Sequence, residues 1–342
     1  MKKTLLIIGA GGFIGGFIAR EAVRRGYDTW AGVRPSTSRR WLDIDSLRII
    51  DFDYDDPDAI LATLHAAAPS PAGWDYIIWN LGATKCANFA DFNRINFEYL
   101  RTFTECLRSA SMLPERFLFM SSLSALGPGD EKNYTPLSGA TIPHPDTRYG
   151  LSKIKAETCL ELQPDLRWTI FRPTGVYGPH ERDYLMMVKS IDAGWDFGVG
   201  YRRQMLTFIY VDDLVAAMFD AINAPATLRR KYIISEDRAY SQADFRRLTA
   251  ASLGKRFVVP VRLPLWAVYA ASVIAEKIAA LRGKPSTLNR DKFKIMRQRN
   301  WSCDISDAQR DFGFTPRWPL VRGLEATVAE YIREKKSRKA KA

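Results

Sequence analysis

Apolar and polar positions follow two alternating patterns along the first half of the chain. Continuous apolar runs such as TLLIIGA (4–10) and YIIWNLGA (76–83) predict strands that are buried on both faces of a parallel sheet. Most of the segments between such runs have the length of a helix. This alternation predicts an α/β fold built on a doubly wound parallel sheet. The other predicted strands are DTWAGVR, LRIIDFD, RFLFMSS and RWTIFRP.

The pattern becomes less regular after about residue 178. A first domain is predicted over 1–178, with a further strand in QMLTFIYV and a helix after it, at about 204–223. The segments 179–203 and 224–330 then form a smaller, mainly helical C-terminal lobe. Within it, LPLWAVYAASVIA extends for only thirteen residues before a Glu-Lys pair, which is too short for a membrane span.

Charge and cysteine content change this picture little. The chain has 342 residues and a net charge of +12, of which +5 lies in residues 331–342, so a solvated, disordered basic tail is predicted rather than a nucleic-acid surface. The four cysteines are far apart and show no CxxC spacing, which argues against a zinc site or a disulfide framework. The N-terminus enters a strand without a signal series, so a cytoplasmic location is expected.

Glycines cluster where the first strand turns into a helix. Gly9, Gly12 and Gly15 are three residues apart, and a helical pattern follows from Phe13. Backbone without Cβ atoms lets a pyrophosphate approach the first N–H groups of a helix, where the dipole favours negative charge. The spacing differs from the usual G-x-G-x-x-G. Its position in the first strand-to-helix turn favours a dinucleotide site over simple helix-strand packing.

The end of the second strand bears on the identity of the cofactor. A site for NAD usually has an acidic residue there, whereas a 2′-phosphate is bound by arginine. The chain has Arg34 at this position, with Arg39 and Arg40 close behind, so NADP is favoured over NAD. The alternative is that Arg34 only caps an exposed strand end. Asp53, at the end of the third strand, is a candidate for the adenine amino group or for capping the next helix.

Two segments carry candidate chemistry, SSLSALG (121–127) and YGLSK (149–153). Tyr149 and Lys153 are four residues apart and share one face of a helix. An ammonium beside a phenol favours the phenolate and lowers its pKa, which suits a general acid/base. A serine at the neighbouring strand end would hold a substrate oxygen against the tyrosine.

Together these motifs resemble the extended short-chain dehydrogenase/reductase superfamily of epimerases, dehydratases and reductases, over residues 4 to about 223. The resemblance implies that Tyr149 is the acid/base and that Lys153 lowers its pKa and binds the nicotinamide ribose. Ser122, five residues before Gly127, is the catalytic serine by this comparison, with Ser124 as the competitor. The matching motifs are GAGGFIG, NLGAT, FMSSLSALG, YGLSK, FRPTGVYGP and TFIYVDDLV.

The resemblance also implies a Rossmann-type cofactor site, a homodimer built from helices around 93–111 and 149–162, and no metal. A small-molecule substrate is expected and nucleic acid is not. The expected cofactor-binding residues are Gly9, Gly12, Phe13, Ile14, Gly15, Arg34, Asp53, Leu81, Gly82, Lys153 and Pro173.

The substrate side departs from the nucleotide-sugar branch of the superfamily. Gly175 and Leu206 stand where those enzymes usually carry an asparagine and an arginine that hold a diphosphate. Arg202 and Arg203 lie nearby and are candidates to take the place of these anchors. The segment from Val261 resembles the substrate cap of sterol-dehydrogenase-like and dihydroflavonol-reductase-like members, so its apolar run would line a pocket, rest on a membrane surface or simply pack as helix. The candidate substrate residues are Lys85, Ser124, His180 and Arg202.

Three functions follow as hypotheses. The first is an NADP-dependent reductase or dehydrogenase acting on a carbonyl/alcohol pair. The second is an epimerase or dehydratase of a sugar derivative that keeps a tightly bound NAD. The third is a dinucleotide-binding protein without catalysis, against which the presence of serine, tyrosine and lysine together argues.

Overall fold

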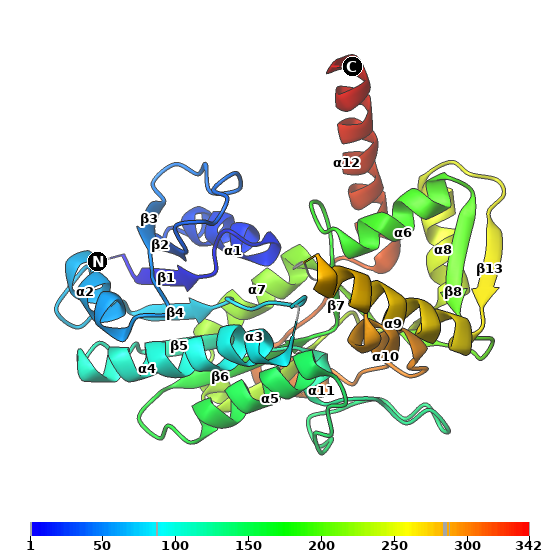
Figure 1. The fold of residues 1–342 in the computed structure, drawn as a ribbon. Helices are drawn as coiled ribbons and strands as arrows, with labels where there is room; N and C mark the ends of the chain where they lie inside the picture. The colour runs from blue at the N-terminus through cyan, green and yellow to red at the C-terminus, as the bar shows by residue number, and fades with distance from the viewer. Residues whose placement is uncertain (1, 87, 283–285, 287, 342) are drawn as a thin grey trace.

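A seven-stranded parallel sheet forms the centre of the computed structural model, which describes residues 2–86, 88–282, 286 and 288–341 (Figure 1). The strand order is β11-β6-β5-β4-β1-β2-β3, and every neighbouring pair is parallel. The order reverses beside β1, which is the doubly wound arrangement predicted from the sequence. The strands are β1 (Thr4–Ile8), β2 (Asp28–Val33), β3 (Arg48–Asp51), β4 (Tyr76–Trp79), β5 (Arg116–Met120), β6 (Trp168–Pro173) and β11 (Arg230–Ile234).

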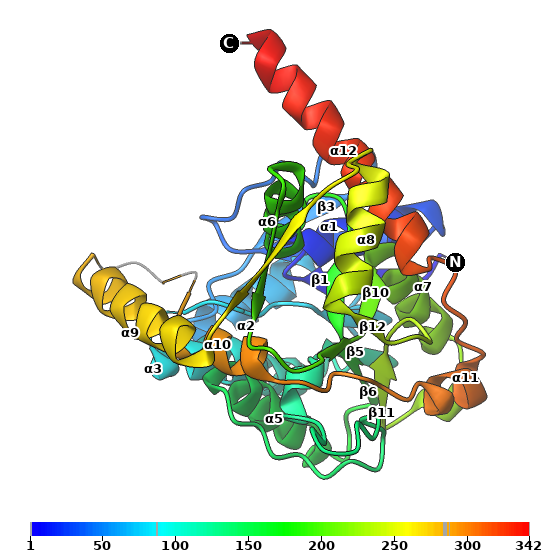
Figure 2. The same ribbon diagram turned by 90° about the vertical axis from the view of Figure 1, so that its right-hand side faces the viewer.

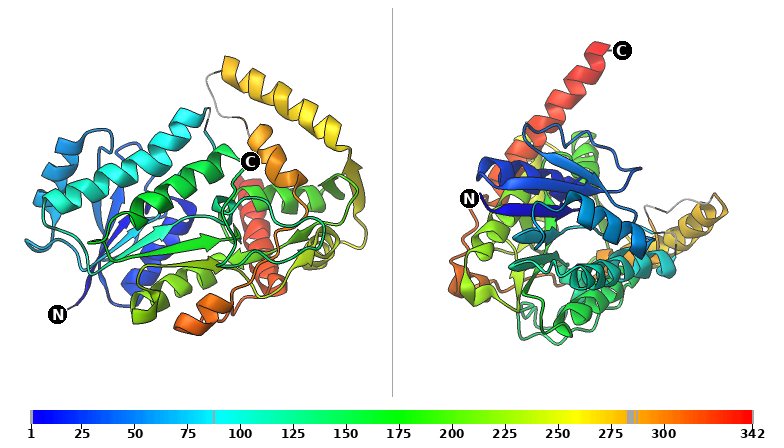
Figure 3. Two further views of the ribbon diagram at one scale, coloured as in Figure 1. Left: turned by 90° about the horizontal axis from the view of Figure 1, so that it is seen from below. Right: turned by 90° about the vertical axis from the view of Figure 1, so that its left-hand side faces the viewer.

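Helices cover both faces of this sheet (Figure 3). Successive side chains of β1 point to opposite faces, so Leu5 and Leu6 belong to two separate hydrophobic clusters. One cluster is closed by α1 (Phe13–Arg24) and α7 (Val211–Ile222). The other is closed by α2 (Pro57–Ala67), α4 (Tyr99–Ser109) and α5 (Arg148–Glu161). The short helix α3 (Phe89–Asn93) and a π-helical turn (Arg94–Glu98) precede α4.

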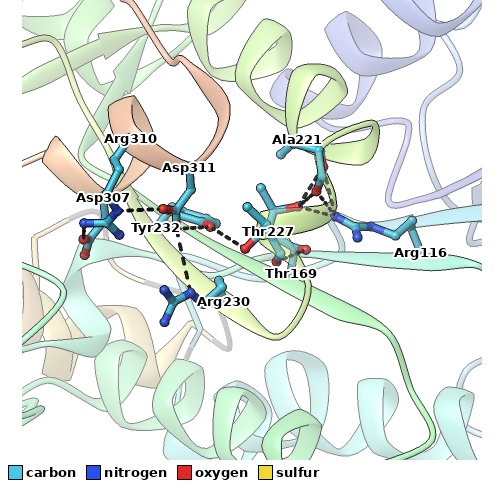
Figure 4. Close-up of polar contacts among 11 residues, drawn as sticks. Arg116, Thr169, Ala221, Thr227, Arg230, Tyr232, Asp307, Arg310 and Asp311 are labelled. Carbon is cyan, nitrogen blue, oxygen red and sulfur yellow. Dashed lines mark hydrogen bonds and ion pairs between the residues drawn. The ribbon is translucent and has the colours of Figure 1, made fainter.

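The last strand of the sheet comes from a segment predicted to lie in the C-terminal lobe. β11 pairs with β6, and one side chain from each strand hydrogen-bonds a segment next to the pair (Figure 4). The Tyr232 hydroxyl donates to Asp311 of α11 (Ser306–Phe312) at 2.8 Å, and Thr169 donates to the Thr227 carbonyl at 2.8 Å. The predicted domain boundary is therefore wrong at this point, because residues 230–234 complete the central sheet.

The strand predicted at 204–211 also differs in the structure. It divides into β9 (Met205–Leu206) and β10 (Phe208–Tyr210), and neither joins the central sheet. β10 pairs with β7 (Gly175–Tyr177), and β9 pairs with β12 (Tyr240–Ser241). A third pair, β8 (Trp195–Val199) with β13 (Val259–Leu263), lies at the edge of the lobe away from the central sheet (Figure 1). The helices of the lobe are α6 (Asp183–Asp192), α8 (Gln242–Ser252), α9 (Leu265–Leu281) and α10 (Arg290–Arg297).

The basic tail is helical rather than disordered. Helix α12 spans Leu320–Lys341 and projects beyond the lobe (Figure 1). Its first turns are anchored by the buried Leu320 and Leu324, and the Tyr331 hydroxyl donates to Asp192 at 2.8 Å. The segment after Gly323 contains neither glycine nor proline, so nothing in it interrupts the helix.

Candidate active site

A cavity of about 1190 Å³ lies at the carboxyl ends of the central strands. It begins at the glycine turn after β1, passes the ends of β4, β5 and β6, and continues between α6, β8 and α10 of the lobe. Open α/β sheets bind ligands in the crevice where the strand order reverses. The cavity therefore lies where the fold is expected to place a cofactor, with the lobe supplying the other wall.

The glycines of the turn divide into two kinds. A Cβ on Gly9, where φ is +83°, would lie 2.6 Å from the Leu81 nitrogen, and one on Gly15 would lie 2.3 Å from the Gly9 carbonyl. The turn itself requires these two glycines. A Cβ on Gly12 would meet nothing closer than 3.5 Å, so the protein alone has room for it.

Gly12 is also the N-cap of α1, and no side chain caps this helix. Gly12, Phe13 and Ile14 line the cavity, which leaves the start of α1 available to an anionic group. A pyrophosphate fits this place, because the unsatisfied N–H groups and the helix dipole both favour it.

Three arginines follow β2, and they differ in what they contact. Arg39 pairs with Asp51 at 2.7 Å, and the Arg40 guanidinium lies 3.7 Å from the centre of the Trp41 ring. Arg34 is exposed and lines the cavity, and within the described part of the chain its side chain has no carboxylate partner. Arg34 is thus the arginine that remains available to a 2′-phosphate. Thr37 and Ser38, which the sequence did not single out, line the same end of the cavity.

Asp53 does not line the cavity, contrary to the expected contact with adenine. Its carboxylate accepts from the Asp55 backbone N–H at 3.1 Å, and Asp56 is the residue that caps α2. The neighbouring Tyr54 lines the cavity instead, and its buried hydroxyl has no hydrogen-bond partner among the described residues. An unpartnered buried hydroxyl is costly, so it marks a place where a ligand group would be stabilised.

Tyr149, Lys153 and Ser122 meet at the floor of the cavity. The Ser122 side chain is near enough to lower the pKa of the Tyr149 hydroxyl, against the larger effect of burial. The Lys153 Nζ donates to the Met120 carbonyl at 2.8 Å and lies 6.0 Å from the centre of the Tyr149 ring. Ser124 lines the cavity too, but its backbone N–H donates to the Ser122 Oγ at 3.2 Å. Of the two candidate serines, Ser122 is the one that lowers the pKa of the tyrosine.

Burial dominates the protonation of this group. It raises the pKa of Tyr149 to about 12, against the opposing effect of Ser122. Burial also lowers the pKa of Lys153 to about 8, although the nearby Glu157 carboxylate favours the ammonium. The lowered tyrosine pKa expected from the lysine is therefore not what these contacts give. Tyr149 is held protonated at neutral pH, which suits a proton donor.

The start of α5 is held against the serine turn by close backbone packing. The Thr147 side chain caps the helix by accepting from the Gly150 backbone N–H at 3.0 Å. A Cβ on Gly150 would lie 2.3 Å from the Ser124 carbonyl, so glycine is needed for this approach. This packing brings Tyr149 to Ser122.

Asn96 connects the segment after β4 to α5, and it was not singled out from the sequence. This buried residue of the π-helical turn accepts from the Ala83 N–H at 2.7 Å and donates to the Ser152 hydroxyl at 2.8 Å. Ser152 in turn donates to the Tyr149 carbonyl at 2.7 Å. A single polar residue on a buried helix face changes no periodicity, so only its tertiary contacts reveal it.

A charged cluster lies on the lobe side of the cavity, where the carboxylates Glu181, Asp196 and Asp291 are also lining residues. The Lys85 ammonium lies 2.6 Å from Asp183 of α6, and the Lys292 ammonium of α10 lies 3.0 Å from the same carboxylate. Burial would raise the pKa of Asp183, but Lys292 and Lys85 outweigh it and hold that pKa below its usual range. These two ammonium groups and one carboxylate sum to +1, but Glu181 and Asp291 also line this end of the cavity, so its formal charge is not positive. Lys85 was predicted from the sequence, whereas Asp183 and Lys292 come from distant segments and were missed.

The rest of the lobe side is largely apolar, and it lacks room for one of the usual diphosphate anchors. A Cβ on Gly175 would lie 1.9 Å from the Tyr184 hydroxyl oxygen, so Tyr184 fills the space an asparagine side chain would take. Leu206 lines the cavity at the position of the second anchor. Other apolar lining residues are Phe92, Met186, Met187, Trp195, Phe197 and Met296.

Two predicted substrate residues lie elsewhere. His180 has φ of +75°, and this turn directs its ring onto Trp41, with the ring centres 3.8 Å apart. Arg202 is exposed, and its carbonyl accepts from Arg299 at 3.3 Å. Neither residue lines the cavity, so the structure gives no support to either prediction. The remaining cavity-lining predictions, besides those described above, are Leu81, Gly82 and Pro173.

Comparison with known proteins agrees with this arrangement. The model of the NAD-dependent epimerase/dehydratase family matches residues 5–235, from β1 through β11. The chain belongs to this family. Its resemblance to the extended short-chain dehydrogenase/reductases is confirmed, since the family's fold and its cofactor turn are both present.

Curated relatives of this epimerase/dehydratase chain match over shorter stretches. Human short-chain dehydrogenase/reductase family 42E member 1 is 31% identical over 173 residues, which cover 46% of this chain and 43% of the relative. The zebrafish (Danio rerio) protein of the same name is 31% identical over 127 residues, covering 35% and 33%. The chain thus spans less than half the length of these relatives.

Solved structures match along nearly the whole chain. UDP-glucose 4-epimerase from Thermotoga maritima, solved with UDP-glucose, is 19% identical with a TM-score of 0.77 and covers 97% of this chain and 99% of its own. The dTDP-glucose 4,6-dehydratase DesIV from Streptomyces venezuelae, solved with NAD, is 18% identical with a TM-score of 0.77, covering 97% and 98%. At these identities the similarity shows the fold.

Proposed function

We propose that the protein is an NADP-dependent reductase or dehydrogenase that acts on a carbonyl/alcohol pair in a largely apolar substrate. The observation that carries this proposal is that Tyr149, Ser122 and Lys153 line one cavity with the glycine turn and with Arg34, which has no carboxylate partner among the described residues. The family supports a nicotinamide cofactor, and the choice of NADP rests on Arg34.

The residues of the cavity fit this cofactor from end to end. The start of α1 at Gly12 to Ile14 would hold the pyrophosphate, and Arg34 would hold the 2′-phosphate. Lys153 would bind the nicotinamide ribose. When bound, the cofactor supplies the hydride donor or acceptor.

The protein's own part of the reaction is proton transfer and positioning. Ser122 would hold the substrate oxygen next to the Tyr149 hydroxyl. In reduction Tyr149 gives its proton to that oxygen, for which a group protonated at neutral pH is suited. This step leaves a phenolate, which the Lys153 ammonium would stabilise, and in oxidation that phenolate takes the proton from the alcohol. The partly buried site excludes water from the reacting oxygen.

The substrate class follows from the lobe side of the cavity. The positions of two diphosphate anchors are Gly175, closed by Tyr184, and the apolar Leu206, which disfavours a nucleotide sugar. The apolar lining favours a hydrophobic substrate body. The ammonium groups of Lys85 and Lys292, which share the Asp183 carboxylate, would hold a single polar or anionic group on it.

Replacing Tyr149 by phenylalanine tests the proposal. Tyr149→Phe should lower turnover of NADPH with a panel of apolar ketones and aldehydes by at least ~100-fold, the lower range for a lost general acid. Its NADPH affinity should match that of the unmodified protein, which shows that the cavity is intact. Unchanged turnover would remove Tyr149 from the mechanism.

An epimerase or dehydratase that retains NAD is the second candidate. It is favoured by the family itself and by structural neighbours that were solved with NAD and with a nucleotide sugar. Against it stand the two missing anchors and the residue after Ser122, which is Leu123 rather than an acid. Incubation with UDP-glucose or dTDP-glucose decides the matter, since a conversion without net change in the nicotinamide would support this candidate.

We also propose a homodimer through the helices over 93–111 and 149–162. Leu151 and Leu162, 40% and 77% exposed, would be covered by such an interface. Light scattering of the protein as it elutes from a size-exclusion column should give twice the monomer mass of 38.8 kDa. The mass of a monomer would contradict the proposal.

A further inference from the structure

Helix α9 presents an apolar face that the described residues leave exposed. Trp266, Ile274, Ile278 and Leu281 are 75%, 58%, 43% and 89% exposed. Steps of about three or four residues separate most of these positions, so they lie on one side of the helix. Single exposed apolar side chains are common on proteins, but a continuous face of this kind marks an interaction surface.

The opposite side of α9 accounts for its attachment to the lobe. Val268 is buried there, the Tyr269 ring packs on Phe293 of α10 with centres 5.3 Å apart, and Glu276 pairs with Arg290 at 2.9 Å. Figures 2 and 3 show α9 at the outer edge of the lobe, beside α10 and away from the central sheet. The helix is therefore fixed in place through one side while its apolar side faces outward.

Positive charge is concentrated around this helix. Residues 255–299 contain eleven Lys and Arg and two acidic residues, a net charge of +9. Residues 331–342 add a further +5, so these two segments together carry +14. Because the whole chain carries +12, all the other residues together have a net charge of −2. Lys277 on the exposed side and Arg282 just after the helix are both exposed. Of the two acids in the segment, Glu276 is already paired with Arg290 and Arg148.

The apolar surface continues from α9 to the mouth of the cavity. Trp195 and Phe197 of β8 line the cavity and are 47% and 55% exposed. β8 pairs with β13, and β13 leads through Pro264 directly into α9. Leu263 and Leu265, on either side of that proline, are also exposed. One surface thus joins the entrance of the cavity to the outer helix.

We propose that α9 is an interfacial helix that docks the protein on the surface of an anionic lipid bilayer. Its apolar face would enter the boundary between headgroups and acyl chains, where tryptophan and tyrosine are favoured. The surrounding Lys and Arg would lie against lipid phosphates, and the long Lys277 side chain would reach back to the headgroups. None of the helices in the described ranges has the length and apolar composition to cross a membrane. Docking of this kind is at the surface.

Docking would place the aromatic mouth of the cavity next to the bilayer. If the proposed function holds, an apolar substrate would then enter from the lipid phase. This second step rests on the proposed function, whereas the lipid binding does not.

Sedimentation of the full chain with vesicles tests the docking. We expect the protein to pellet with vesicles of mixed phosphatidylcholine and phosphatidylglycerol and to remain in solution with phosphatidylcholine alone. Added salt should release it, because surface charge is screened. Trp266→Ser combined with Ile274→Ser should weaken partition at least ~10-fold, as expected for loss of two buried apolar side chains.

Ile142→Ser is the matched control, since Ile142 is 83% exposed in the loop before α5 and lies outside the proposed surface. It should pellet like the unmodified protein. NADPH titration of each variant shows whether the fold is intact, independently of lipid. The proposal is overturned if anionic vesicles do not bind the protein, if neutral vesicles bind it equally, or if Ile142→Ser loses as much binding as the double variant. It is also overturned if Ile274→Ser dissociates a dimer in lipid-free solution, because a second copy would then cover the face.

Discussion

Removing the Arg34 guanidinium should weaken NADPH binding selectively. Arg34 lines the cavity at the end of β2 and makes no ion pair with the described residues, so in the complex it would pair with the 2′-phosphate alone. A hydrogen bond to a charged group contributes about 1.5–3 kcal/mol, which corresponds to roughly a 10- to 150-fold change in Kd. Because Arg34 is exposed, we expect the lower half of this range for Arg34→Ala.

Fluorescence titration with NADPH and NADH measures the effect directly. The Kd for NADPH should rise by about 10-fold or more in Arg34→Ala, and the Kd for NADH should stay within about twofold, since NADH has no 2′-phosphate. The preference of the unmodified protein for NADPH over NADH should also fall as salt is added, because salt screens the charge of the 2′-phosphate. Arg39→Ala is the control, because Arg39 is already paired with Asp51. Equal weakening for both cofactors, or an equal effect of Arg39→Ala, would refute the assignment of Arg34.

Three further predictions concern the turn, the buried lysine and the charged cluster. Gly15→Ala should lower the free energy of unfolding by about 1–3 kcal/mol in chemical denaturation, because its Cβ would lie 2.3 Å from the Gly9 carbonyl oxygen. Gly12→Ala should leave the free energy of unfolding unchanged and weaken cofactor binding. The reverse result would contradict the division of the glycines into two kinds. Lys153 has a pKa of about 8 in the folded protein against 10.5 as the ordinary value, so the unfolded chain binds more protons between these values and stability should rise with pH there. Relative to Lys153→Met, the gain from pH 7 to pH 10 should be about 2–3 kcal/mol by urea unfolding, and parallel pH profiles would show that Lys153 is not desolvated. Lys292→Met should raise KM for substrates with an anionic group more than for uncharged ones, and equal effects would exclude the cluster from recognition.

The parts of the site that sequence could predict are those encoded within short segments. The glycine turn, Arg34 and the Tyr149–Lys153 pair each depend on spacing within one element, and the structure places all of them on the cavity. Likewise β1, β2, β4, β5 and β6 show as apolar runs because these parallel strands are buried on both faces.

The parts that sequence could not predict depend on contacts between distant segments. Asp183 and Lys292 are 109 residues apart, and only the folded lobe brings them together. His180 and Arg202 were chosen for charge and nearness in sequence to the expected cleft, but the positive φ of His180 and the exposed loop of Arg202 turn them away from it. β11 was assigned to the lobe because it follows the irregular segment in the sequence. Its pairing with β6, which the sequence order does not reveal, places it in the central sheet.

The nucleotide carried by the purified protein is the most direct test of the account. The protein would be denatured, and any released nucleotide would be identified and quantified by mass spectrometry and absorbance. A reductase that exchanges its cofactor should release less than one nucleotide per chain, with NADP(H) exceeding NAD(H), and the emptied protein should bind NADPH more tightly than NADH. Stoichiometric NAD would contradict the account, because a retained NAD is what an epimerase or dehydratase requires.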